Sequence, residues 1–281
     1  MTTSRRRLVA LTIAATLAVL ATLGAAGGAL VLYGGFYNVA STRAHFQWVH
    51  SLLELGMQRS VRRHARDIAP PPLTGAQLIG RGAGLYRDNC VTCHGAPGVA
   101  QDDIGQSMQP VPGPLADAAR RWHPNELYWI TRHGIKMSGM PAWEYHLSDQ
   151  DIWAVVAFLV ALPALSPQAY AALPDQAGHP QRAARPAHAQ ADAQRGRLAL
   201  SQYACNACHL IPGVTGPDTM VGPPLHDLAA RQYIAGGLPN SAANLTRWIQ
   251  DPQRIRPNSA MPAMGVTESD ARDIAAYLLQ P

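Results

Sequence analysis

Charge is scarce in this sequence: charged residues make up 15% of the 281 residues, and the formal net charge is only +5. Even this small excess is confined to one end, because residues 1–74 hold eight arginines against Glu54 and Asp67. The rest of the chain is close to neutral and offers no basic stripe of the kind that binds phosphate backbones. We therefore expect no nucleic-acid partner.

Charge is absent altogether from the stretch between Leu8 and Tyr33, which directly follows Arg5, Arg6 and Arg7. As a helix rising about 1.5 Å per residue, a stretch of this length reaches roughly 39 Å, whereas the hydrocarbon core of a bilayer is about 30 Å thick. Since arginines mark the cytoplasmic end of such helices, the pattern predicts a single-pass inner-membrane anchor. Everything after the anchor would then lie in the periplasm.

A cleaved signal peptide is the competing interpretation of this segment, with Gly24, Ala25 and Ala26 as a small-residue cleavage site. The apolar part of a signal peptide runs for about 7–15 residues. Here apolarity continues through Leu32. We therefore expect an anchor, while the sequence leaves its cleavage open.

Cysteine is also rare, and the four cysteines occur in two identical arrangements. Cys90 and Cys93 stand in CVTCH, and Cys205 and Cys208 stand in CNACH. Four cysteines could form two disulfides, redox dithiols or a zinc site, but none of these needs a histidine directly after each second cysteine. Covalent haem does, because two thiols add to the vinyl groups and the histidine ligates the iron. The sequence therefore predicts two covalently attached haem c groups.

The two motifs lie within an internal repeat. A glycine-containing helical segment precedes each motif, and Met-Pro-Ala follows it, at Met140 and at Met261. A second amphipathic helix comes next, over 147–159 in the first unit and 266–278 in the second. Each of these helices begins with a pair resembling a capping box. The pairs are Ser148 with Asp151 and Thr267 with Asp270, and the apolar stripes are Ile152, Val155, Val156 and Leu159, and Ile274, Tyr277 and Leu278.

Each unit has a helix, a CxxCH motif, a loop, Met-Pro and a second helix, in that order. A unit of this size and order resembles a class I cytochrome c. The resemblance covers about 75–165 and 190–281. The run 221–262, with its GPPL, AGGLPN and WIQDPQRIRPNSAMP segments, is similar to the cytochrome c domain of caa3-type oxidase subunit II. No copper-site segment accompanies it, so we do not expect that subunit itself. The resemblance implies a mainly α fold, with an N-terminal transmembrane helix followed by two class I cytochrome c domains.

The resemblance also implies how each unit would hold its haem. His94 and His209 would be the proximal ligands, each following the two cysteines that form thioethers. In the second unit the carbonyl of Pro223 would accept the other N–H of the histidine, and Leu225 would lie against the ring. In the first unit the equivalent carbonyl lies in 112–113, and the choice between Pro112 and Gly113 stays open.

The distal ligand is a choice between two methionines in each unit. The first unit offers Met137 and Met140 in KMSGMPAW, and the second offers Met261 and Met264 in AMPAMG. When the repeats are overlaid, only Met140 and Met261 share the following Pro-Ala. We therefore expect these two to ligate iron and the other two to pack nearby.

Further aromatic and imidazole side chains have less specific interpretations. Trp143 and Trp248 either shield the haem edges or pack the core, and the sequence favours neither. The remaining histidines of the two units are expected to be structural or superficial, because each iron already has a better ligand. They are His123, His133, His146 and His226.

The expected domain organisation has five parts. They are the cytoplasmic tip and anchor (1–34), a juxtamembrane helical segment (35–74), cytochrome domain 1 (75–165), a Pro/Ala-rich linker (166–191) and cytochrome domain 2 (192–281). Within the juxtamembrane segment, 41–68 has apolar residues at helical spacing and a basic end. It could lie on the membrane surface, pack on a partner subunit or form a stalk.

These features predict a dihaem electron carrier without a small-molecule substrate. Its partners would be redox proteins, such as a terminal oxidase or a membrane dehydrogenase complex, that meet it through small transient contacts. The alternative is a dihaem peroxidase, which needs one iron with an open position. A haem-based gas sensor needs the same opening and an output domain, and no such domain is visible in the sequence.

Overall fold

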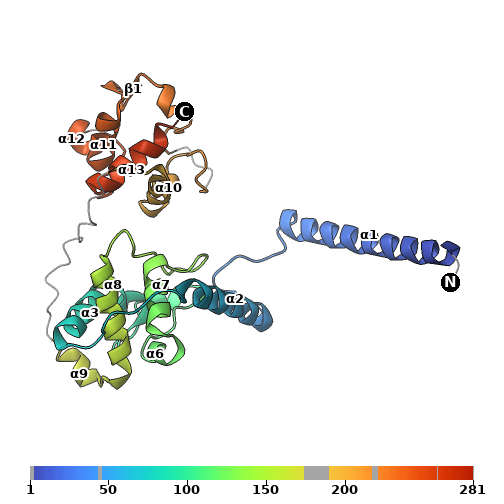
Figure 1. Ribbon diagram of the computed structural model, residues 1–281, viewed down its shortest axis with the longest axis horizontal. Helices are drawn as coiled ribbons and strands as arrows, with labels where there is room; N and C mark the ends of the chain where they lie inside the picture. The colour runs from blue at the N-terminus through green and yellow to red at the C-terminus, as the bar shows by residue number, and fades with distance from the viewer. Residues whose placement is uncertain (1–2, 44–45, 174–189, 217–220, 258, 281) are drawn as a thin grey trace.

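The structure is a computed structural model that describes residues 3–43, 46–173, 190–216, 221–257 and 259–280. The prediction of a mainly α fold is confirmed (Figure 1). Within these ranges the sheet structure is one short pairing of β1 (Tyr233–Ile234) antiparallel to β2 (Leu238–Pro239). Helices therefore position both candidate sites.

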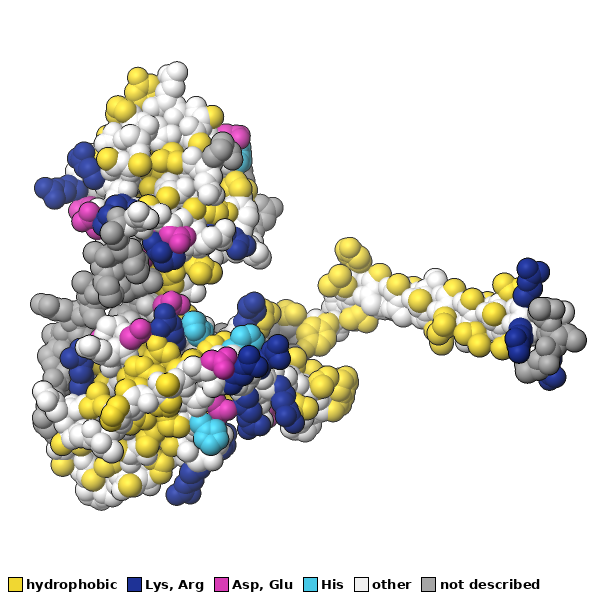
Figure 2. Space-filling view, in the orientation of Figure 1, with side chains coloured by type: hydrophobic (Ala, Val, Ile, Leu, Met, Phe, Trp, Pro, Cys, Tyr) yellow, Lys and Arg dark blue, Asp and Glu magenta, His cyan; other side chains and the backbone are white. Residues whose placement is uncertain are grey.

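The N-terminal helix α1 (Thr3–Tyr33) runs for 31 residues, and its described side chains are all exposed. Over Ser4–Tyr33 it is long and apolar enough to cross a membrane, by length and composition. Figure 1 draws it as a rod apart from the two helical bodies, and Lys and Arg side chains gather at its tip in Figure 2. An apolar helix with no buried side chain is what the predicted anchor requires.

Helix α2 (Gln47–Ala65) resolves part of the question about 41–68. Its C-terminal end packs on the first unit, where Val61 and Ala65 are fully buried and the Asn125 side chain donates to the Ala65 carbonyl at 2.8 Å. Its N-terminal half instead exposes apolar residues, among them Leu52 and Leu53. The segment is therefore joined to the first unit at one end, a contact that its sequence pattern did not indicate.

The first unit is built from α3 to α9. These elements are α3 (Ala76–Asn89), α4 (Val91–His94), α5 (Asp103–Ser107), α6 (Ala118–Arg121), α7 (Pro124–His133), α8 (Asp149–Ala161), the 3₁₀ turn η1 (Leu162–Ala164) and α9 (Pro167–Ala171). Its core gathers around Tyr86 of α3 and Phe158 of α8, whose ring centroids lie 5.1 Å apart.

The second unit repeats this plan with fewer helices. Its elements besides the two strands are α10 (Ala193–Gln202), the 3₁₀ turns η2 (Cys205–Ala207) and η3 (Leu228–Ala230), α11 (Ala242–Gln250), α12 (Pro252–Ile255) and α13 (Glu268–Leu278). Its core includes Leu200 of α10, Leu245 of α11 and Ile274 of α13. In both units the helix before CxxCH packs against the helix that follows the Met-Pro-Ala loop, α3 on α8 and α10 on α13.

A glycine makes each of these helix crossings possible. A Cβ on Gly82 of α3 would lie 1.9 Å from the Ala154 carbonyl oxygen, and a Cβ on Gly196 of α10 would lie 2.0 Å from that of Asp273. An ion pair beside each crossing joins the same two helices. Arg81 donates to Asp151 at 2.7 Å, and Arg195 donates to Asp273 at 2.8 Å.

The predicted N-caps of the helices that follow Met-Pro-Ala, α8 and α13, are confirmed. Ser148 accepts from the Asp151 amide at 3.1 Å, and Thr267 accepts from the Asp270 amide at 3.2 Å. All predicted apolar positions of α8 are buried, as are Ile274 and Leu278 of α13. Tyr277 is only half-buried, because its hydroxyl reaches out to the Pro212 carbonyl at 2.6 Å.

The first unit extends beyond the boundary predicted at residue 165. Tyr170 of α9 is 5% exposed, and its ring centroid lies 6.1 Å from that of Phe158 in the core. Leu173 packs against the same core. The expected linker start at 166 is therefore too early, since a buried tyrosine and a helix cap at Ser166 tie this stretch to the domain. The central part of the expected linker, 174–189, lies outside the described residues.

Candidate haem-binding sites

The first CxxCH motif forms one helical turn at the end of α3. The Cys90 amide donates to the Tyr86 carbonyl at 2.9 Å, which closes α3. The Cys90 carbonyl then accepts from the Cys93 and His94 amides at 3.1 and 2.9 Å. This turn brings both sulfurs and the imidazole to one end of the helix.

The second motif makes the same turn by a slightly different route. Ala204 adopts the left-handed conformation (φ 53°) and starts η2 directly after α10. The Cys205 carbonyl accepts from the Cys208 and His209 amides at 3.2 and 3.0 Å, as its counterpart does in the first unit. Two motifs 115 positions apart in sequence therefore share one local geometry.

A backbone carbonyl orients each of the two imidazoles. His209 Nδ1 lies 2.7 Å from the Pro223 oxygen, the contact expected from the sequence, and His94 Nδ1 lies 2.8 Å from the Gly113 oxygen. In the first unit the choice between 112 and 113 therefore falls on Gly113, because the Pro112 carbonyl accepts from the Gln101 side chain instead. With Nδ1 held by a carbonyl, Nε2 is the nitrogen left to face a metal.

Gly222 is a feature of the second site that the sequence reasoning did not single out. A Cβ there would lie 2.5 Å from Cε1 and 2.7 Å from Nδ1 of His209. The Gly222 amide also donates to the Cys208 carbonyl at 2.7 Å, and Leu225 donates to the Leu210 carbonyl at 2.8 Å. The backbone of 222–225 thus lies against the imidazole, and the GPPL sequence was the signal that could have indicated it.

The structure treats the two methionines of each unit differently. Met140 and Met261 are half-buried, whereas Met137 is 94% exposed and Met264 is 37% exposed. The Met140 amide donates to the Ser138 hydroxyl at 3.2 Å, and the Met261 amide donates to the Ser259 hydroxyl at 3.1 Å. In each unit, therefore, a serine two residues before the methionine of Met-Pro-Ala binds the backbone of that methionine.

Burial changes the acidity of the cysteines that begin each motif. It raises the pKa of the Cys90 thiol to about 12 and that of Cys205 to about 11, with a smaller contribution from the neighbouring thiol in each case. Reactive redox dithiols have lowered thiol pKa values, so this environment argues against the dithiol interpretation. None of the four cysteines pairs in a disulfide, and the described residues contain no group of three or more His, Cys, Asp or Glu side chains that could hold a metal ion.

Burial also lowers the pKa of His94, and the Gly113 hydrogen bond opposes this only in part. A lowered pKa keeps the imidazole neutral near physiological pH, which is the form that ligates a metal.

The Cys93 carbonyl accepts from Gln101 at 2.6 Å. The whole motif is therefore held from the loop that follows it.

The other histidines have partners away from the CxxCH turns. His123 caps α7 together with Glu126, His133 lies 3.6 Å from Glu144, and His226 lies 2.9 Å from Asp227. Trp143 packs against the first core, and Trp248 packs against the second. His146 has two aromatic neighbours, Trp143 and Tyr203.

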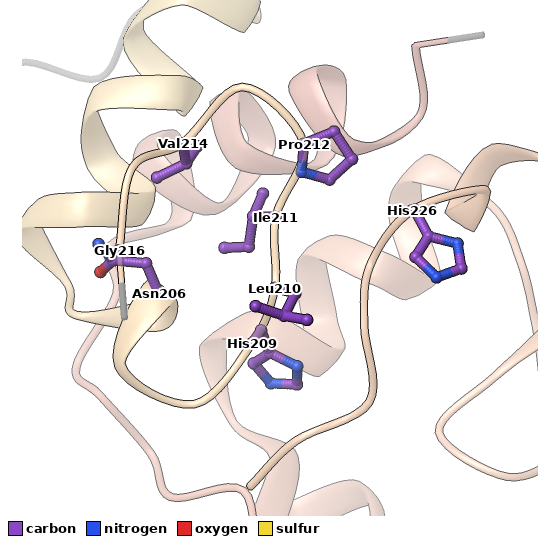
Figure 3. Close-up of a pocket in the computed structure, with 8 residues that line it drawn as sticks. All are labelled: Asn206, His209, Leu210, Ile211, Pro212, Val214, Gly216 and His226. Atoms are coloured by element: carbon purple, nitrogen blue, oxygen red, sulfur yellow. The ribbon is translucent and has the colours of Figure 1, made fainter. Parts of the chain in front are cut away.

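A small cavity lies beside the second motif, between the loop after CNACH and His226 (Figure 3). Asn206, His209 and Pro212 line it, and its volume is about 170 Å³. Small-molecule sites typically enclose about 300–1,000 Å³. The cavity is therefore too small for a substrate of ordinary size.

Comparison with known families decides the class of both units. Residues 77–159 match the family described as cytochrome C oxidase, cbb3-type, subunit III, and residues 193–280 match the family described as cytochrome c. The chain carries two cytochrome c domains. The prediction drawn from the repeat is thereby confirmed, and such domains imply covalently bound haem c and electron transfer in a respiratory context.

One relative extends this comparison. An 87-residue stretch of the chain is 38% identical to the protein named Cytochrome c oxidase subunit 2 from Alkalihalophilus pseudofirmus. The match covers 31% of this chain and 25% of that relative, so the chain spans about a quarter of the relative's length. The predicted resemblance to an oxidase subunit II is confirmed at this level. No solved structure matches the chain significantly.

Proposed function

We propose that the chain is a membrane-anchored dihaem cytochrome c that passes single electrons between respiratory partners at the periplasmic face of the inner membrane. One observation carries this proposal: the same three contacts occur in both cytochrome c domains. They are the CxxCH turn, the hydrogen bond from imidazole to carbonyl, and the serine-held methionine before Pro-Ala.

The residues of each domain fit one haem c. Cys90 with Cys93, and Cys205 with Cys208, would form the thioethers. His94 and His209 would supply the proximal nitrogen, and Met140 and Met261 would supply the distal sulfur. Once bound, haem c supplies an iron that gains or loses one electron, and a His/Met ligand pair raises its reduction potential relative to two nitrogen ligands.

Two axial side chains in each domain favour an electron carrier over an enzyme. A dihaem peroxidase is the alternative, and it needs one iron with an open coordination position. Because Ser138 and Ser259 hold both methionine backbones in the same way, neither domain differs from the other as a peroxidatic site would. We therefore propose electron transfer with no small-molecule substrate and no nucleic-acid partner.

Two observations support the proposed location and partners. The apolar helix α1 follows Arg5, Arg6 and Arg7, which would keep its start cytoplasmic and both domains periplasmic. The names of the matched family and of the relative both refer to cytochrome c oxidases. We propose a redox protein as partner, either a terminal oxidase that receives electrons or a membrane dehydrogenase complex that delivers them.

Spectroscopy of the full-length protein tests this function. We expect two haem c groups per chain, and a near-infrared methionine–ferric band from each. Met140→Ala should remove the band of the first haem, while the matched control Met137→Ala should leave both, because Met137 is exposed. Peroxide turnover together with a missing band in the wild-type protein would favour the peroxidase instead.

A further inference from the structure

A tyrosine of the first domain is buried among the core residues of the second. Tyr145 follows the Met-Pro-Ala loop of domain 1, yet it is 7% exposed and belongs to the cluster that includes Leu200, Ile274 and Tyr203. Its ring centroid lies 5.9 Å from that of Tyr203, with an interplanar angle of 76°. This edge-to-face geometry is the preferred one for aromatic pairs.

His146 adds a second contact across the same boundary. Its ring centroid lies 6.5 Å from that of Tyr203 and 6.1 Å from that of Trp143. Trp143 packs against the core of domain 1, so aromatic rings run from one core to the other. In Figure 1 the loop before α8 reaches toward α10 and α13.

Both sides of this contact are fixed within their own domains. The Trp143 carbonyl accepts from the His146 and Leu147 amides at 2.9 and 2.8 Å, and Leu147 is buried in the first core. The Tyr203 hydroxyl donates to Asp270 at 2.8 Å. A contact held rigidly on both sides joins two bodies and does not merely cover a loose loop.

The contact also lies close in sequence to both candidate haem sites. On one side, Met140 is three residues before Trp143 and five before Tyr145. On the other side, Tyr203 is two residues before Cys205, whose sulfur lies 3.9 Å from the Tyr203 carbonyl oxygen. The distal loop of the first site therefore meets the attachment turn of the second.

We propose that Tyr145 and His146 dock domain 1 onto domain 2 through Tyr203, and that this contact is the route for electrons between the two haem sites. The inference rests on the proposed function for its electron-transfer part. With haem c bound at both sites, one electron would leave the ferrous iron of one and reduce the ferric iron of the other. No bond is made or broken, and no proton has to move.

A positive charge introduced at the contact provides the test. Tyr145 is 7% exposed among the apolar residues of the second core. Tyr145→Arg would therefore place a guanidinium in an apolar environment, which is costly without a partner. Tyr145→Phe keeps the ring, and Tyr233→Arg is a control because Tyr233 is 60% exposed in domain 2 away from the contact.

Amide hydrogen exchange in the detergent-solubilised full chain measures whether the two domains are docked, and this measurement does not depend on haem. In Tyr145→Arg we expect faster amide exchange around Tyr203, in a domain whose sequence is unchanged, and no such change in Tyr145→Phe or Tyr233→Arg. Unchanged protection around Tyr203 in Tyr145→Arg would overturn the docking. If that variant does not fold, Tyr145→Ser provides the same comparison.

Pulse reduction of the oxidised protein tests whether electrons pass between the two haem sites through this contact. We expect a fast phase, independent of protein concentration, in which one haem is oxidised as the other is reduced, and its loss in Tyr145→Arg with both methionine bands intact. Persistence of that phase in Tyr145→Arg would overturn the route. Missing haem or missing methionine bands in the wild type would instead contradict the proposed function, and the exchange result would still decide the docking.

Discussion

At the scale of single residues, the two sites are defined by groups that hold the expected ligands in place. Gly113 and Pro223 each present a carbonyl to an imidazole, and Ser138 and Ser259 each hold a methionine backbone. Outer partners of this kind fix the orientation of a ligand and tune the metal. These groups hold the expected ligands without being ligands themselves.

Gly222→Ala should displace His209, because the new methyl group would overlap the imidazole ring. Overpacking of this kind typically costs about 1–3 kcal/mol. We expect less haem in domain 2 and an altered spectrum of that haem, both measured by difference spectroscopy. Gly113→Ala is the matched control in domain 1, since a Cβ there meets no atom within 4 Å, and an equal loss in this control would contradict the prediction.

At the scale of elements, each domain depends on the crossing of the helix before CxxCH with the helix that follows Met-Pro-Ala, α3 with α8 and α10 with α13. The crossing brings backbone against backbone, at Gly82 in domain 1 and at Gly196 in domain 2. The helix periods and the N-cap pairs were predictable from the sequence, because they follow from local chemistry. The role of these two glycines was not, because nothing near them in the chain shows which backbone they meet.

Gly82→Ala and Gly196→Ala should each destabilise their own domain, by about 3 kcal/mol or more, because the methyl group meets a rigid carbonyl. Thermal unfolding followed at the Soret band measures the effect. Gly56→Ala in α2 is the matched control, since a Cβ there finds open space, and it should stabilise the helix by about 0.5–1 kcal/mol. Equal melting temperatures for all three variants would show that the crossings tolerate a side chain.

Helix α2 offers a second prediction at this scale. Val61→Asp would bury a carboxylate at a position that is 1% exposed, which is costly without a partner, and should detach α2 from domain 1. Limited proteolysis should then cleave α2 sooner. Leu53→Asp changes a residue that is 60% exposed and should leave the cleavage rate as in the wild type; a similar acceleration in both variants would argue against the packing.

At the scale of the whole molecule, three parts have separate roles in the proposed function. The apolar helix α1 would hold the chain at the membrane, α2 ties the following segment to domain 1, and the contact at Tyr145 joins the two domains. Each domain has its own core, so each should retain its haem when the anchor is removed.

Replacing residues 1–33 with a cleavable signal peptide should therefore release a soluble periplasmic protein that still carries two haem c groups. Cell fractionation and haem staining measure this outcome, with the unaltered chain as the membrane-bound control. An unaltered chain that appears in the soluble fraction would contradict the proposed anchor, and a released protein that lacks haem would contradict the independence of the domains.

The sequence by itself determined the duplicated CxxCH and Met-Pro-Ala pattern, the helical class and the N-caps of α8 and α13, because these depend on residues close together in the chain. It also selected Met140 and Met261 as the expected ligands, through comparison of the repeats. Only the tertiary structure decided that Gly113 faces His94, that α2 and α9 belong to the first body, and that Tyr145 enters the core of the second. These contacts join residues whose separation in sequence carries no information about their distance in space, and packing alone brings them together.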